Sequence, residues 1–247
     1  MSFFRKLKLD NIKFVELRNS PFYIANINHI KLSEAIIWLS NAINKASQKY
    51  GIIAGLLVTL TRHEHGYDEA CFLLDAIKES KSNIIIGMDI SGDERVNFDR
   101  RVARIYKSAK YEYNLGISIH AGETWNIENV LWTINECEAD RIGHGYAASK
   151  SKEIMELIRE KEICIEVSMI SGIRTGNVKS YEEHPVREFI KYNVPFVLCS
   201  DNPCIHNCTL SDEYRILNDV EQNEKILSDM YRRQKEYSFL RRRGDIL

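Results

Sequence analysis

The sequence predicts an α/β fold in which parallel strands alternate with helices, and a TIM-type (β/α)8 barrel fits it best. Short apolar runs rich in β-branched residues alternate along the chain with segments whose apolar residues recur every three or four positions. Several of these runs end in polar residues, where a parallel barrel keeps its active site. Because 247 residues is a usual length for one such barrel, we expect a single domain over residues 1–247.

Seven apolar runs are predicted to be strands, and six segments between them are predicted to be helices. The strands are expected at residues 12–17, 52–60, 84–90, 116–120, 139–144, 163–170 and 195–200. The helices are expected at residues 33–50, 68–81, 100–113, 127–136, 152–161 and 183–192. An open doubly wound sheet is disfavoured, because no glycine-rich phosphate loop follows the first run. Since a closed barrel of this class needs eight strands, the chain is expected to be one strand short.

Composition narrows the classes of partner and the expected location. The formal net charge of −1 gives no general attraction to nucleic acid or to anionic membranes. No apolar run reaches the length that spans a bilayer, and the first residues lack the apolar core of a signal peptide, so we expect a cytoplasmic protein. The six cysteines lie mostly in or beside apolar runs, which favours buried thiols over disulfides.

Residues with metal-ligand and acid–base chemistry lie at the ends of three predicted strands. His120 and His144 end two successive strands, and Asp201 follows the last one. Imidazole and carboxylate groups are the ligands of hydrolytic zinc sites, which also need a nearby acid or base. Glu123 follows His120 past a small turn, so it could donate a proton, and His144 could hold or deprotonate a water. Any one of these residues alone could be an ordinary half-buried histidine or a helix cap, but together they favour a metal-assisted hydrolase.

With their flanking residues, these motifs resemble the adenosine and AMP deaminase family over nearly the whole chain. The family-like segments are residues 15–21, 62–64, 87–94, 120–123, 141–145, 184–185 and 200–203. The resemblance implies a (β/α)8 barrel. It also implies zinc-dependent hydrolysis of the 6-amino group of adenosine or deoxyadenosine, which yields the 6-oxo purine and ammonia.

The resemblance also implies roles for the residues that match. His120 and Asp201 would bind zinc, Glu123 would protonate purine N1, and His144 would orient the attacking hydroxide. The backbone amide of Gly92 would contact purine N3, an approach that a side chain would hinder.

Two further residues are expected to bind the substrate. Asp89 lies in a family-like segment. Asn202 stands where the family usually has an Asp that contacts purine N7, and an Asn amide can donate to N7 without first being protonated.

One family feature has no counterpart in this sequence. The family takes two more zinc ligands from a His-x-His pair on its first barrel strand, ahead of residues 15–21. We therefore expect this chain alone to bind zinc weakly and to be weakly active or inactive. Exposed strand edges would favour association with an N-terminal complementing fragment or with a second copy of the chain.

Two other readings stay open. The chain could be a catalytically dead family member that acts as a purine-binding or interaction module. It could also be a rewired hydrolase in which His63 and His65, a second His-x-His, complete the site, although a pocket wall or surface loop is the favoured reading of these histidines. Residues 166–171 depart from the family pattern near the substrate, and residues 204–208 are interpreted as structural.

Overall fold

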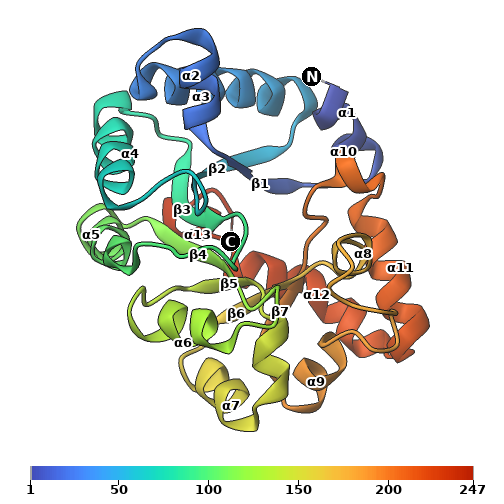
Figure 1. Cartoon of the computed structure of the whole chain (residues 1–247). Coiled ribbons are helices and arrows are strands. Elements are labelled where there is room, and N and C mark those ends of the chain that lie inside the picture. The colour runs from blue at the N-terminus through green and yellow to red at the C-terminus, as the bar shows by residue number, and fades with distance from the viewer. Residues whose placement is uncertain (1, 247) are drawn as a thin grey trace. The chain divides into compact units, whose positions relative to one another are not determined.

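Residues 2–246 are described by a computed structural model of the α/β class. Within them, seven strands alternate with helices (Figure 1), and the strands follow one another in the sheet in chain order, β1 to β7. The residues divide into two compact units, unit 1 (Met1–Ser118 with Phe239–Leu247) and unit 2 (Ile119–Ser238). The predicted seven-stranded α/β fold is confirmed, whereas the single domain over residues 1–247 stays a prediction.

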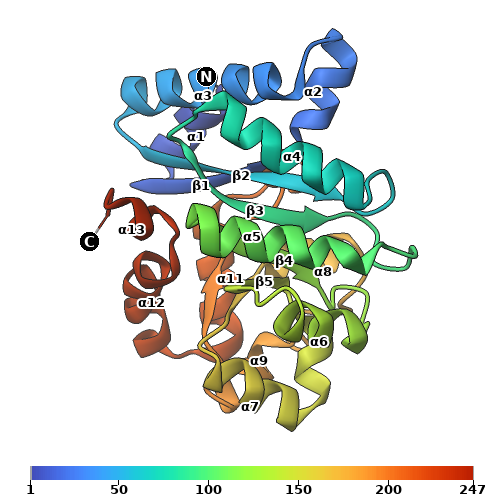
Figure 2. The same ribbon diagram turned by 90° about the vertical axis from the view of Figure 1, so that its left-hand side faces the viewer.

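Unit 1 contains the first three strands and the start of the fourth. The strands are β1 (Phe14–Asn19), β2 (Ile53–Thr61), β3 (Ile85–Ser91) and β4 (Gly116–Ala121), which continues into unit 2. The helices are α1 (Ser2–Leu9), α2 (Pro21–Asn28), α3 (Leu32–Tyr50), α4 (Tyr67–Ser80), the short 3-10 turn η1 (Arg100–Val102), α5 (Ala103–Tyr113) and α13 (Leu240–Arg243). β1 pairs in parallel with β2, and β2 with β3. Figure 2 shows α3 and α4 side by side, and both pack against β2.

The last described residues of the chain are part of the core of unit 1. Phe239 and Leu240 are buried in one cluster with Leu57 of β2 and Ile86 of β3. The carboxylate of Glu16 in β1 accepts hydrogen bonds from the backbone N–H groups of Phe239 (2.6 Å) and Leu240 (3.3 Å). Because these amides lie at the start of α13, the carboxylate satisfies donors that the helix itself leaves unpaired.

Unit 2 contains the remaining strands and most of the later helices. Its strands are the end of β4, β5 (Arg141–His144), β6 (Cys164–Val167) and β7 (Phe196–Leu198). Its helices are α6 (Ile127–Asn135), the 3-10 turn η2 (Tyr146–Lys150), α7 (Lys152–Glu160), α8 (Met169–Arg174), α9 (Val186–Lys191), α10 (Pro203–His206), α11 (Leu210–Glu221) and α12 (Glu224–Tyr237). β5 pairs in parallel with β6, and β6 with β7. A buried ion pair joins Arg141 Nε to Glu166 Oε1 at 2.9 Å.

The structure corrects one predicted strand. Residues 163–170 were expected to be extended, but β6 ends at Val167 and helix α8 begins at Met169. The run is apolar throughout, so its periodicity does not separate a buried strand from a buried helix. The buried carboxyl group of Glu213 accepts from the N–H groups of Met169 (2.8 Å) and Ile170 (3.2 Å), and this distant acceptor stabilises the helical start.

Other features agree with the sequence or add to it. The six predicted helices are present with shifted ends, while α1, α2, α8, α10, α11, α12 and α13 were not predicted. The six cysteines are free thiols, as expected, but only Cys137 and Cys164 are buried, while Cys204 is exposed and the other three are partly buried. No helix within residues 2–246 has both the length and the apolar character needed to cross a bilayer.

Candidate active site

Four predicted site residues converge in unit 2, at or just beyond the carboxyl ends of its strands. His120 lies near the end of β4 and His144 ends β5, and the centroids of their rings are 5.2 Å apart. Glu123 follows β4, and its Oε2 atom lies 3.6 Å from His144 Nε2. Asp201 follows β7, and the imidazoles of His144 and His120 both lower the pKa of its carboxyl group. The structure therefore brings together the residues expected to be the acid, the base and the two metal ligands.

The backbone at this site is unusual. His144 and Asp201 have φ angles of 63° and 49°, in the left-handed region that residues with a side chain rarely adopt. Such conformations cost about 1–3 kcal/mol each and gather at functional sites. Next to them, a Cβ atom on Gly143 would lie 3.2 Å from the Cα and Cγ atoms of His120. A glycine at 143 therefore lets His120 approach β5 closely.

Both oxygens of the Asp201 carboxylate are held by protein groups. The Ser171 hydroxyl donates to Oδ2 at 2.5 Å, and the Asn202 amide donates to Oδ1 at 2.9 Å. His206 Nε2 lies 3.6 Å from Oδ2. Burial raises the pKa of Asp201, but the nearby His144 and the Ser171 hydrogen bond outweigh it, so this pKa lies below its ordinary value. Asp201 is thus an ionised carboxylate.

The buried side chain of Tyr146 contacts the His144 ring at Nδ1. The Tyr146 hydroxyl is 3.4 Å from His144 Nδ1 and 3.4 Å from the Ser168 carbonyl oxygen. Burial, with the Glu123 carboxylate second, raises the pKa of Tyr146 well above its ordinary value, so the phenol stays protonated. The contact at Nδ1 leaves His144 Nε2 as the nitrogen that faces Glu123.

His184 packs against this tyrosine from another side. Its ring is 5.3 Å from the Tyr146 ring and nearly perpendicular to it, and its Nδ1 accepts from the backbone N–H of Val186 at 3.1 Å. Burial lowers the pKa of His184 to about 3, so it is neutral at physiological pH. A neutral ring suits a position beside residues that carry the site's charges.

Several residues at the site were not predicted as functional. They are Tyr146, Ser171, Asn177, His206 and Glu213. Ser171, Asn177 and Glu213 act through contacts with segments at least 30 positions away in the sequence, which a local pattern does not reveal. Two signals were available: residues 166–171, which were expected near the substrate, and residues 204–208, which were interpreted as structural.

The two other predicted substrate residues, Asp89 and Gly92, belong to unit 1. Asp89 is fully buried, and its Oδ1 lies 3.3 Å from the Arg18 guanidinium while Thr59 donates to Oδ2 at 3.4 Å. Gly92 has a φ angle of 92°, and a Cβ atom there would lie 3.1 Å from His63 Nδ1. The backbone at Gly92 therefore requires a glycine, as the predicted close approach also would.

His63 and His65 also lie in unit 1, and one of them is already engaged. His65 Nδ1 accepts from the backbone N–H of Thr61 at 3.0 Å, and its ring stacks on Phe22 at 4.1 Å. Burial lowers the pKa of His65. His63 is about half exposed, with Nε2 3.5 Å from Glu64. Across the described residues, no group of three or more His, Cys, Asp or Glu side chains is arranged to hold a metal ion.

The sequence matches a family model described as adenosine deaminase over residues 1–243. The chain belongs to the adenosine deaminase family. The adenosine deaminase of Clostridium kluyveri is 30% identical over 211 residues, which cover 84% of this chain and 59% of that protein. The chain thus spans about three fifths of the length of this curated relative.

Solved structures of deaminase-type proteins share the fold of this family member. An amidohydrolase from Burkholderia ambifaria with bound zinc has a TM-score of 0.87 at 20% identity, covering 96% of this chain and 66% of that one. Arabidopsis ADAL complexed with IMP has a TM-score of 0.79 at 20% identity, covering 94% and 69%. These likenesses confirm the predicted barrel-type fold class.

Proposed function

We propose that this chain provides acid–base and metal-binding groups of a zinc-dependent purine deaminase. The substrate would be adenosine or deoxyadenosine, and the products the 6-oxo purine and ammonia. One observation carries the proposal: His120, Glu123, His144 and Asp201 converge in unit 2, with Glu123 Oε2 and His144 Nε2 3.6 Å apart. A carboxyl group beside an imidazole supplies a proton donor and a proton acceptor within one site.

In this proposal Glu123 acts on the purine and His144 acts on the water that adds to it. Glu123 gives its proton to purine N1, which withdraws electrons from C6 and makes that carbon electrophilic. His144 Nε2 takes a proton from the water that adds at C6, while Tyr146 holds the other ring nitrogen. His120 and Asp201 would hold a zinc ion, whose chemistry would be to make a water molecule more acidic. The protonated His144 then gives its proton to the 6-amino group, which leaves as ammonia, and the Glu123 carboxylate takes the proton of the C6 hydroxyl as the 6-oxo group forms.

The donor set fits zinc in type but not in number. Imidazole and carboxylate are both zinc ligands, yet catalytic zinc sites use three protein ligands, and residues 2–246 offer no arranged group of three. We propose that the remaining ligands come from a His-x-His strand in an N-terminal complementing segment. Zinc affinity without them would be weak.

The substrate contacts are also part of the proposal. Gly92 and Asp89 of unit 1 and Asn202 of unit 2 would bind the purine. Because a structural relative is complexed with IMP, a nucleoside monophosphate is the second substrate class to test.

Adenosine turnover tests the proposal, read as the loss of purine absorbance. The chain is assayed with zinc alone and then with a peptide or domain that supplies the His-x-His strand. Turnover only after complementation supports the proposal, and turnover by the chain alone would mean that other residues complete the site. Zinc content after dialysis should be lost in Asp201→Ala. Full zinc retention in that variant would contradict the ligand assignment.

A second function is favoured by the way Asp201 is held. Its carboxylate accepts from Ser171 and Asn202 within the chain, so each of its two oxygens already has a hydrogen-bond donor from the protein. A catalytically inactive purine-binding module would keep such a site. Calorimetric titration with inosine separates the two cases: binding with no turnover under any complementation favours the binding module.

A further inference from the structure

The carboxyl group of Glu123 is oriented by a side chain from a distant loop. The Asn177 side-chain amide donates to Glu123 Oε1 at 3.2 Å. The other oxygen, Oε2, is the one that lies 3.6 Å from His144 Nε2. Each oxygen of Glu123 therefore has a different neighbour, and the two are not interchangeable.

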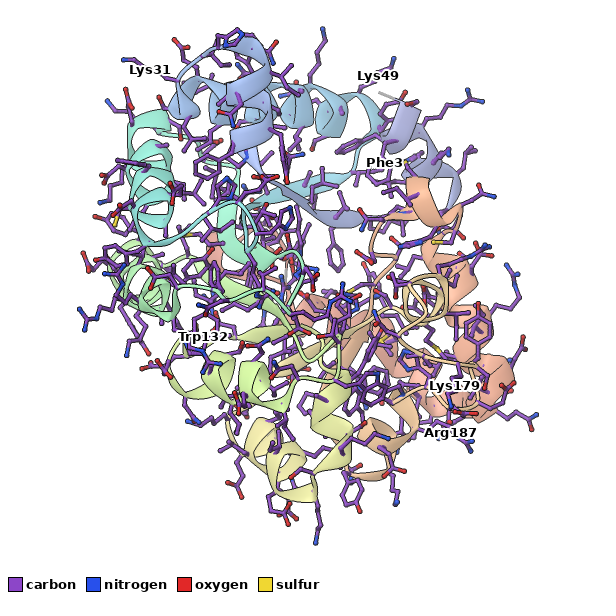
Figure 3. The ribbon with its side chains drawn as sticks, viewed as in Figure 1. Phe3, Lys31, Lys49, Trp132, Lys179 and Arg187 are labelled. Carbon is purple, nitrogen blue, oxygen red and sulfur yellow. The ribbon has the colours of Figure 1, made fainter. Side chains whose placement is uncertain are left out.

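Asn177 is itself fixed at several points. Its amide nitrogen also donates to Thr175 Oγ1 at 3.0 Å, so both of its N–H bonds are used. The backbone carbonyl oxygen of Asn177 accepts from the Trp125 indole N–H at 2.9 Å. The next residue, Val178, donates to the Gly172 carbonyl at 3.0 Å, which ties the segment to α8. The side chain of the following residue, Lys179, is exposed and is labelled in Figure 3.

The Trp125 indole forms a second link between the loop that carries Glu123 and the segment that carries Asn177. Trp125 lies two residues after Glu123 and has a φ angle of 65°, a left-handed conformation for a residue with a large side chain. Its ring lies 6.0 Å from that of Tyr146, and the Lys150 ammonium lies 4.8 Å from its centroid. The loop that carries Glu123 thus holds the Asn177 backbone, while the Asn177 side chain holds Glu123.

We infer that Asn177 is a positioning residue for the proton donor Glu123, a role that rests on the proposed deaminase function. With the amide on Oε1, the proton that Glu123 delivers is confined to Oε2, on the side of His144. The same hydrogen bond stabilises the carboxylate that remains after the proton has left. Asn177 would therefore promote proton delivery without touching the substrate.

The test uses the enzyme assembled with its complementing strand and compares Asn177→Ala with Thr175→Val. Asn177→Ala should lower kcat for adenosine about tenfold, the effect of one charge-assisted hydrogen bond, and leave KM within about twofold. Thr175→Val removes an acceptor in the same loop but keeps the donor to Glu123, so kcat should stay within about twofold. In a Glu123→Gln background, Asn177→Ala should add no further loss. The side-chain amide resonance of Asn177, identified by its loss in Asn177→Ala, should move in Glu123→Gln.

Each outcome decides between the claims. Equal losses of kcat in both loop variants, an unchanged kcat in Asn177→Ala, or an unmoved amide resonance would overturn the positioning role and leave the proposed function standing. No turnover by the assembled wild-type enzyme would overturn the proposed function and this role with it.

Discussion

Units 1 and 2 use their buried polar side chains in different ways. In unit 1, Asp89 is paired with Arg18 inside the strands, and Glu16 accepts from the backbone at the start of α13. In unit 2, Glu123 and His144 lie at strand ends, on or beside left-handed backbone, with their reactive atoms facing each other. In unit 1 these carboxylates contact a guanidinium and backbone N–H groups, whereas in unit 2 the Glu123 carboxyl faces an imidazole, a pairing that allows proton transfer.

The largest expected effect separates the two kinds of carboxylate. In the assembled enzyme, Glu123→Gln should lower kcat about a thousandfold, because a general acid is lost, while nucleoside binding is retained. Glu16→Gln changes a structural carboxylate of unit 1 and should keep kcat within about threefold. Steady-state kinetics with adenosine would measure both. Similar losses in the two variants would contradict the division of roles.

Buried ion pairs give the next comparison. Arg141 and Glu166 of unit 2 are 6% and 7% exposed, and Arg141 also donates to the Tyr237 carbonyl at 3.0 Å. Arg141→Met should lower the free energy of unfolding by about 3–5 kcal/mol, because a buried carboxylate loses its partner. Arg18 is 24% exposed, so water screens its attraction for the buried Asp89, and Arg18→Met should cost about half as much. Urea unfolding measures both, and equal costs would show that exposure does not set the difference.

Stability should also depend on pH through Glu213. Burial raises its pKa from an ordinary 4.5 to about 7. Between these values the unfolded chain loses the proton while the native chain keeps it, so the free energy of unfolding falls as pH rises, by at most about 3 kcal/mol. Below 4.5 and above about 7 the contribution is constant. Urea unfolding of Glu213→Gln should show a smaller decline over this range than the wild type, and an equal decline would exclude Glu213 as the source.

The smallest effects compare two glycines with left-handed backbone. A Cβ atom on Gly122 of unit 2 would lie 2.7 Å from Val130 Cγ2, whereas Gly51 of unit 1 has no atom within 4 Å of that position. Gly51→Ala should cost about 1 kcal/mol of stability from backbone strain. Gly122→Ala adds crowding and should cost about 2–3 kcal/mol, measured by thermal or urea unfolding. A larger loss for Gly51→Ala would mean that packing does not decide the cost.

The sequence predicted what depends on local pattern. The strands and the polar residues that end them follow from periodicity within a few residues, which is why His120, His144 and Asp201 were found. The contacts that hold these residues in place span the chain: Asn177 and Glu123 are 54 positions apart, Ser171 and Asp201 30, and Met169 and Glu213 44. Without an account of packing, a sequence pattern does not predict such pairs.

The helix α8 was missed for the same reason. Its residues favour a buried segment of either kind, and the acceptor that caps it comes from α11. Asn202 was predicted to contact the purine, and in the structure its amide donates to Asp201. Its contact with a substrate stays a prediction.

The return of the chain to unit 1 has a consequence for synthesis on the ribosome. Glu16 and the backbone of Phe239 that it binds are 223 positions apart, and the residues of unit 2 lie between them. A nascent chain emerges from its N-terminus, so unit 2 can gather all of its own residues before Phe239 and Leu240 reach Leu57 and Ile86. The unit translated first is therefore the last to be complete, and until then its apolar cluster is available to chaperones.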